Sequence, residues 1–164
     1  MRKILNVSGV VILLLLIAAV LPLTVPKLFG YQLYGILTGS MEPALPVDSV
    51  IYVKSCDPSQ LSPGDIITFR LGSGTDLVET HRVVSVDRAS GLITTKGDAN
   101  EENDQTQVQF GNVIGTVRFR LPLLGLLAQW IHSAQGIAAC VVIFAAVLLM
   151  WLLADRLKPK ENAK

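Results

Sequence analysis

Two long segments without charged side chains, one near each end, most constrain how this chain can fold. Residues 4–26 and residues 121–154 contain no Lys, Arg, Asp or Glu, and residues 10–21 consist only of Val, Ile, Leu and Ala. As a helix, the most apolar part of the second segment, residues 136–154, would extend about 28 Å, close to the thickness of a membrane hydrocarbon core. We therefore predict transmembrane helices over residues 4–26 and 134–154.

Each segment has an alternative interpretation. Arg2 and Lys3 before an apolar run are typical of a cleaved signal peptide, but the sequence after Leu21 lacks the pair of small residues that cleavage requires. The second segment could be a buried core helix, but it has no polar face to present to water. We interpret residues 121–133, which precede the second helix, as an interfacial approach segment.

The charge distribution predicts the orientation. Residues 1–30 carry a net charge of +3, residues 155–164 carry +2, and residues 31–120 carry −4. Lys and Arg next to membrane spans favour the cytoplasmic side. We expect a cytoplasmic N-terminus (residues 1–3), a basic cytoplasmic tail (155–164) and an extracytoplasmic domain (27–120) in a multi-pass protein of the cell membrane. The overall net charge of +1 argues against nucleic-acid binding.

The middle segment predicts a mainly β domain. Short runs rich in β-branched residues occur at 49–54, 65–70, 77–87, 91–96 and 113–120, and turn-forming Pro, Gly, Asp and Asn residues separate them. No run of ten residues in the segment has a helical period. The predicted fold is a small β-rich domain flanked by an N-terminal and a C-terminal transmembrane helix.

Few polar side chains in this segment can do chemistry at neutral pH. His81 is its one imidazole, and a purely structural histidine is an equal alternative there. Ser40 lies in the sequence LTGSMEP, where Gly39 permits a sharp turn and Pro43 stiffens the exit, so its hydroxyl would be held outward. Cys56, alone in the segment, is interpreted as a small buried apolar residue rather than a nucleophile.

An acidic, turn-forming segment contains two further candidates, Asp98 and Asp104. The simplest interpretations of residues 97–104 are a solvated loop or a divalent-cation site, but the spacing lacks the Gly and Glu positions of an EF-hand loop. Taken alone, each of these signals is weak.

Together and in this order, the motifs resemble type I signal peptidases. The matching blocks are residues 39–43, 64–69, 80–84, and 95–100 with Asp104. In the common bacterial branch of that family a Lys general base precedes the Arg-Val-Val sequence, whereas here the residue is His81. The chain thus resembles the endoplasmic-reticulum, archaeal and spore-former branch, which is understood to use Ser, His and Asp. The resemblance implies a β-rich catalytic domain on the outer membrane face and no metal or organic cofactor.

The resemblance also implies roles for these residues. A serine hydroxyl needs a positioned base, which His81 could supply to Ser40, and a carboxylate must orient the imidazole. The resemblance favours Asp104 for that role and Asp98 as a supporting residue, although the sequence alone leaves their order open. The Ser40 N–H and the Thr38 hydroxyl are candidate donors to the oxyanion, and Glu42 is interpreted as structural.

The implied function is removal of signal peptides from secretory preproteins, with cleavage after small residues at −3 and −1. The apolar residues 31–37 could form one wall of the substrate groove. The lipid bilayer is an expected partner, and the secretion translocon or accessory membrane subunits are further candidates. Two alternatives remain: a self-cleaving Ser-Lys protease with Lys54 as base, and a non-enzymatic membrane-anchored β domain that binds or assembles. The latter predicts that Ser40, His81 and the two aspartates do not converge.

Overall fold

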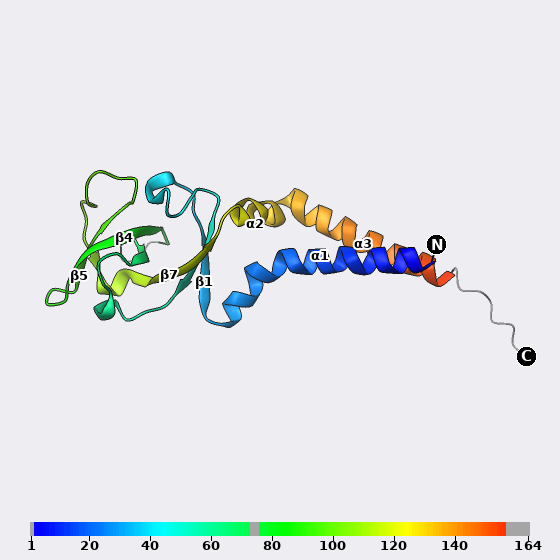
Figure 1. Cartoon of the computed structure of the whole chain (residues 1–164), viewed down its shortest axis with the longest axis horizontal. Coiled ribbons are helices and arrows are strands. Elements are labelled where there is room, and N and C mark those ends of the chain that lie inside the picture. Colours follow the sequence, from blue (N-terminus) through cyan, green and yellow to red (C-terminus); the bar gives the residue numbers. More distant parts are fainter. Residues whose placement is uncertain (1, 73–75, 157–164) are drawn as a thin grey trace, which may run out of the picture. The chain divides into compact units, whose positions relative to one another are not determined.

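The computed structural model describes residues 2–72 and 76–156 (Figure 1). The chain divides into two compact units, one made of residues 1–25 and 128–164 and the other of residues 26–127. Most of the basic tail predicted for residues 155–164 lies outside the described residues.

The first unit is helical. Helix α1 spans Arg2–Leu28, and α3 spans Ala134–Arg156. Both helices are long and apolar enough to cross a membrane, and few of their residues are buried. Gly9 of α1 lies against the indole of Trp151 of α3. The helices are apolar on every side because their sequences have no polar stripe, which suits a lipid environment better than water.

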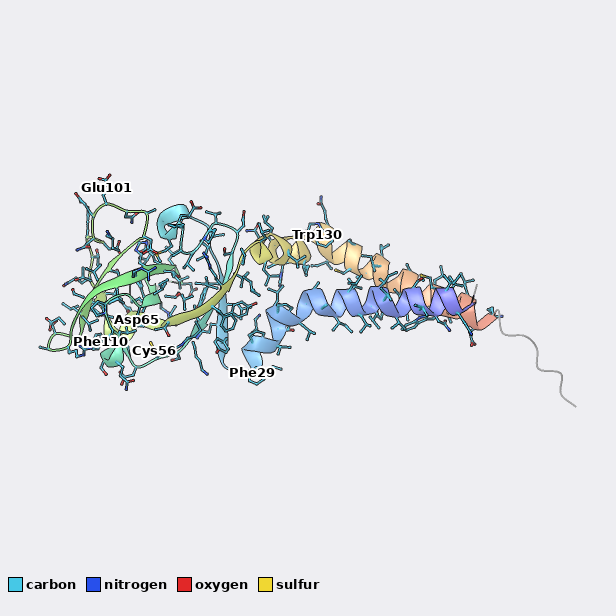
Figure 2. All side chains as sticks on the ribbon, viewed as in Figure 1. Phe29, Cys56, Asp65, Glu101, Phe110 and Trp130 are labelled. Atoms are coloured by element: carbon cyan, nitrogen blue, oxygen red, sulfur yellow. The ribbon has the colours of Figure 1, made fainter. Side chains whose placement is uncertain are left out.

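A short helix, α2 (Leu124–His132), occupies most of the predicted approach segment. Ser133 then separates α2 from α3, and its hydroxyl accepts the Gly136 N–H at 3.0 Å. This is an N-cap interaction, which satisfies a donor in the first turn of α3. Trp130, on α2, is half exposed (Figure 2).

The second unit contains one antiparallel sheet of seven strands, which confirms the mainly β prediction. The strands are β1 (Tyr31–Gly35), β2 (Val50–Lys54), β3 (Ile66–Arg70), β4 (Val78–Asp87), β5 (Leu92–Lys96), β6 (Val108–Gln109) and β7 (Val113–Leu121). Their order in the sheet is β1-β2-β7-β3-β4-β5-β6. The five runs expected from the sequence correspond to β2, β3, β4, β5 and β7.

Two clusters of apolar side chains form the core of this unit. The first comprises Ile36, Met41, Leu45, Ile51, Val53 and Ile114, and the second comprises Leu61, Ile67, Phe69, Val83, Ile93 and Val108. Cys56 packs against the second cluster, and this burial raises the pKa of its thiol. The thiol is therefore less available as a thiolate than an exposed one.

Strand β4 changes its partners along its length. Residues 78–82 pair with β3, whereas residues 82–87 pair with β5, with a bulge between Val83 and Ser85. On the edge facing away from β3, residues 78–81 have no partner among the described strands. This stretch therefore offers backbone N–H and C=O groups to an added extended segment.

Candidate active site

Ser40 lies in a single turn of 3₁₀-helix, Gly39–Met41, between β1 and β2. The next residue, Met41, is 1% exposed and belongs to the first core cluster. The N–H of Leu45 donates to the Met41 carbonyl at 2.7 Å. The buried methionine thus anchors the turn and leaves the neighbouring serine partly exposed.

His81 lies on β4 and is 2% exposed. Its Nε2 is 3.2 Å from the Ser40 Oγ. The Phe69 ring packs edge-on against the imidazole, with 6.4 Å between the ring centroids. This packing limits the positions available to the imidazole and keeps Nε2 beside the serine.

Asp104 approaches His81 from the opposite side of the ring. Its Oδ2 is 2.6 Å from the His81 Nδ1 and also accepts the Thr95 hydroxyl at 2.6 Å. The Asp104 N–H donates to the Thr95 carbonyl at 2.9 Å, so both backbone and side chain fix the carboxylate. Because an ionised carboxylate only accepts, Nδ1 carries the hydrogen, and the lone pair of Nε2 points to Ser40.

The segment between β5 and Asp104 passes directly over the backbone of Ser40. The Ala99 N–H donates to the Ser40 carbonyl at 2.9 Å. A Cβ atom on Gly97 would lie 2.6 Å from that carbonyl oxygen, which is closer than real Cβ contacts allow. Glycine at this position therefore permits the approach that joins the serine turn to the segment carrying Asp104.

Asp98 binds Arg82 instead of His81. Its two carboxylate oxygens accept from Nε and Nη2 of Arg82 at 2.7 and 2.6 Å, and Nη1 of Arg82 donates to the Gly64 carbonyl at 2.8 Å. The hydrogen bonds from Arg82 lower the pKa of Asp98, and the same pairing raises the pKa of Arg82. The pair ties the loop after β5 to strand β4 on the face opposite His81.

The other predicted residues lie around this centre. The Thr38 Oγ1 is 3.4 Å from the Ser40 Oγ, and Thr38 is exposed. Lys54, the alternative base, has its ammonium 5.2 Å from the centroid of the Tyr31 ring. The structure thus brings Ser40, His81 and Asp104 together. Thr38 lies beside Ser40, and Asp98 binds Arg82, the residue next to His81 in the sequence.

Three neighbours of the site were not assigned roles from the sequence: Thr95, Arg82 and Glu79. The Glu79 Oε1 is 3.5 Å from the His81 Nε2. Side chains two residues apart on a strand share a face, so the spacing from His81 could have indicated Glu79. In the described part of the chain, no three His, Cys, Asp or Glu side chains are grouped so as to hold a metal ion.

A hydroxyl, an imidazole and a carboxylate in this order of contact have the geometry of a serine-hydrolase triad. No protein-family model matches the chain. Among curated proteins, it is 41% identical over 91 residues to "Signal peptidase I W" of Bacillus subtilis (strain 168), covering 54% of this chain and 47% of that protein. It is 30% identical over 102 residues to "Signal peptidase complex catalytic subunit SEC11C" of Homo sapiens, covering 56% and 53%.

A third relative shares a larger part of its length with this chain. The "Signal peptidase complex catalytic subunit SEC11" of Lachancea thermotolerans is 30% identical over 126 residues, which cover 67% of this chain and 74% of that protein. The chain therefore belongs to the type I signal peptidase family. It spans about half the length of the first two relatives.

The Arg82–Asp98 pair predicts a pH-dependent contribution to stability. Because the folded pKa of Asp98 is lowered, the contribution is present above the unfolded value of about 3.9 and is lost as the pH falls through the folded value. We expect Asp98→Asn to lower the free energy of unfolding by about 1 kcal/mol near neutral pH. Thermal unfolding of the detergent-solubilised chain, followed by circular dichroism from neutral pH to about pH 3, measures the difference.

The matched control is Glu101→Gln, at the tip of the loop after β5 (Figure 2), which removes an exposed carboxylate that has no ion pair among the described residues. The Glu101→Gln variant should unfold at the same temperature as the wild type at every pH in this range. A deficit of Asp98→Asn that stays constant down to the acid end of the range would contradict this role of the pair.

Proposed function

We propose that this protein is a membrane-bound serine endopeptidase that removes signal peptides from secretory preproteins. The observation that carries the proposal is the contact sequence from Ser40 through His81 to Asp104 in a chain of the signal peptidase family. A non-enzymatic β domain gives no reason for these three side chains, distant in sequence, to meet in this order.

In the proposed mechanism, the Ser40 Oγ attacks the carbonyl carbon of the scissile bond, and His81 Nε2 takes up the hydroxyl proton. Asp104 stabilises the resulting imidazolium through Nδ1–H, and Thr95 holds the carboxylate in place. As the intermediate collapses, His81 gives its proton to the leaving nitrogen, and Ser40 remains as an acyl ester. Water, deprotonated by the same imidazole, then hydrolyses the ester and regenerates the serine.

The unpaired edge of β4 is the proposed binding edge for the peptide. An extended peptide beside residues 78–81 would pair with a free backbone edge that leads to His81. Alternate side chains of such a peptide face the same way, so the residues at −1 and −3 share one wall. We propose that this wall selects small residues, as the family resemblance implies.

The proposed triad makes a graded prediction for cleavage of a model preprotein with Ala at −3 and −1 by the detergent-solubilised enzyme. Ser40→Ala and His81→Lys should lose at least about 10³-fold in kcat, and Asp104→Asn about 10³–10⁴-fold. Asp98→Asn should lose far less, because Asp98 contacts Arg82 and not the imidazole.

Circular dichroism of each variant checks that a loss of cleavage is not a loss of fold. Cleavage by Ser40→Ala at the wild-type rate would reject the catalytic assignment. A larger loss for Asp98→Asn than for Asp104→Asn would exchange the proposed roles of the two aspartates.

The oxyanion would be stabilised by the Ser40 N–H and the Thr38 hydroxyl. Ser40 lies in the first turn of a 3₁₀-helix, where N–H groups have no acceptor within the helix. The Thr38 hydroxyl lies 3.4 Å from the Ser40 Oγ. Both donors can therefore reach charge that develops next to the nucleophile.

We expect Thr38→Val, which keeps the shape but removes the hydroxyl, to lower kcat about 10²–10³-fold. Thr38→Ser is the matched control and should retain most of the activity, since it keeps the donor. Steady-state cleavage of the same preprotein gives both values. Equal activity of the Val and Ser variants would exclude Thr38 from the oxyanion site.

For the membrane arrangement, we propose that α1 and α3 both cross the membrane, with both termini cytoplasmic and residues 27–120 outside. The apolar helices and the basic residues beside them support this topology. The relatives named as subunits of a signal peptidase complex support accessory membrane subunits as candidate partners.

Thiol labelling of intact cells tests the orientation. In a Cys56→Ala, Cys140→Ala background, Glu101→Cys should react with a membrane-impermeant maleimide, whereas Lys3→Cys should react only after permeabilisation. Both positions are exposed in the structure, so the difference reports the side of the membrane. Labelling of Lys3→Cys in intact cells would show that the proposed topology is wrong.

A further inference from the structure

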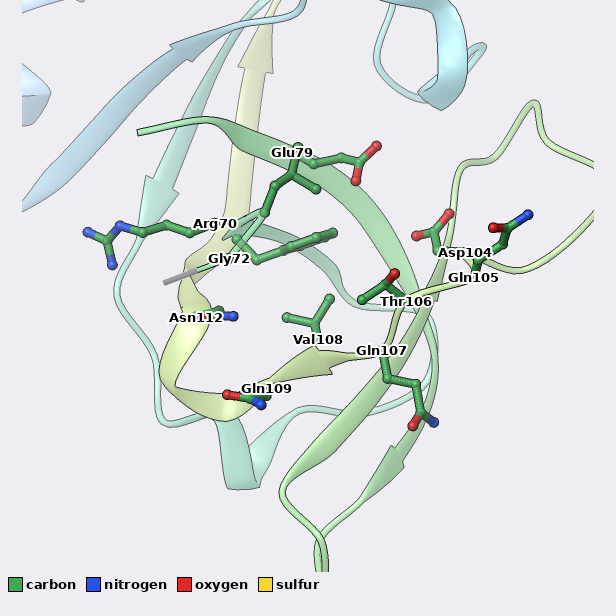
Figure 3. Close-up of a pocket in the computed structure, with 12 residues that line it drawn as sticks. Arg70, Gly72, Glu79, Asp104, Gln105, Thr106, Gln107, Val108, Gln109 and Asn112 are labelled. Carbon is green, nitrogen blue, oxygen red and sulfur yellow. The ribbon is translucent and has the colours of Figure 1, made fainter. Parts of the chain in front are cut away.

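A groove of about 510 Å³ lies between the ends of β3 and β4 and the segment 104–112 (Figure 3). His81 does not line it, but two of its lining residues, Glu79 and Asp104, contact His81. At its catalytic end it is lined by two carboxylates, Glu79 and Asp104. The rest of its polar lining consists mainly of neutral side chains: Gln105, Thr106, Gln107, Gln109 and Asn112. Amides both donate and accept hydrogen bonds, so this lining suits the backbone of a polar, extended peptide.

The position of Glu79 relates the groove to one side of the scissile bond. In the proposed reaction His81 Nε2 delivers a proton to the leaving nitrogen, so the first residue after the cut must lie next to Nε2. The Glu79 Oε1 is 3.5 Å from that same atom. The acyl side of the substrate is attached to Ser40 instead. One residue that lines the groove therefore lies beside the atom that would give a proton to the leaving segment.

The charge at this end of the groove is negative. Glu79 is 36% exposed, and among the described residues its one ion-pair contact is with His81. Among the described residues that line the groove, the one cationic residue is Arg70, and its side chain points away from the groove in Figure 3. Its charge acts instead on Tyr34, where it opposes the rise that burial causes in the pKa of that phenol. A side chain entering beside His81 thus meets Glu79 without a compensating cation.

We propose that this groove receives the first residues of the mature protein, and that Glu79 selects among them by charge, favouring Lys or Arg and disfavouring Asp or Glu. This inference rests on the proposed function. It makes Glu79 a specificity determinant that contacts the leaving segment. The carboxylate is not needed for the proton transfer, which His81 performs with Asp104.

The experiment compares three preproteins that differ only in the two residues after the cut, which are Lys-Lys, Gln-Gln or Glu-Glu. With the full-length, detergent-solubilised enzyme at low salt, we expect kcat/KM for Lys-Lys to exceed that for Glu-Glu by about threefold to fivefold. Glu79→Gln should bring the ratio of Lys-Lys to Glu-Glu cleavage close to one, with its own kcat/KM for the Gln-Gln substrate as the internal reference, and Glu79→Lys should invert the ratio. The control Glu101→Gln removes an exposed carboxylate outside the groove, so it should keep the wild-type ratio of Lys-Lys to Glu-Glu cleavage.

The outcomes separate this inference from the function on which it rests. If the wild type cleaves the substrates without a charge preference, or if Glu79→Gln keeps the preference, the inference is wrong and the proposed function stands. If Glu79→Gln slows all three substrates equally, Glu79 acts through His81 and not on the substrate, which also overturns the inference. If the wild type cleaves none of the three while an active relative cleaves them all, the proposed function fails and the inference fails with it.

Discussion

The close approach of two backbone segments, the Ser40 turn and the loop after β5, is the contact on which the site depends. The Ala99 N–H binds the Ser40 carbonyl, and only glycine at position 97 leaves space for that oxygen. The same loop goes on to Asp104, which returns to pair with Thr95 and reaches the imidazole. A serine hydroxyl and a carboxylate from distant parts of the chain are thus placed on either side of a histidine that lies on a strand of the sheet.

Most of the sheet could be predicted because its strands are β-branched runs bounded by Pro, Gly and Asp. Two strands could not. Residues 31–35 of β1 were expected only as part of an apolar groove wall, since they follow closely on a long apolar segment. Strand β6 is only two residues long, Val108–Gln109, too short to show an alternating pattern. Such strands are determined by their pairing partners and not by local sequence.

The residues of the candidate site could be predicted from the sequence, but not all of the contacts between them. Two aspartates six residues apart in one loop have the same chemistry, so the sequence left open which of them faces the histidine. In the structure the answer follows from strand geometry, because His81 and Arg82 are consecutive and point to opposite faces of β4. Asp98 binds Arg82 on one face, and Asp104 binds His81 on the other. The same alternation places Glu79, two residues before His81, on the His81 face of the strand.

Because of that alternation, the register of β4 decides which of its side chains lies beside Ser40. A slip of β4 by one residue would exchange the faces of its side chains and place Arg82, a permanent cation that cannot accept a proton, beside Ser40. The ladder that prevents this is anchored twice, to β3 through residues 78–82 and to β5 through residues 82–87, with a bulge where the second pairing begins. Which side chain of β4 lies beside Ser40 is therefore determined by backbone hydrogen bonds far along the strand as well as by the local sequence.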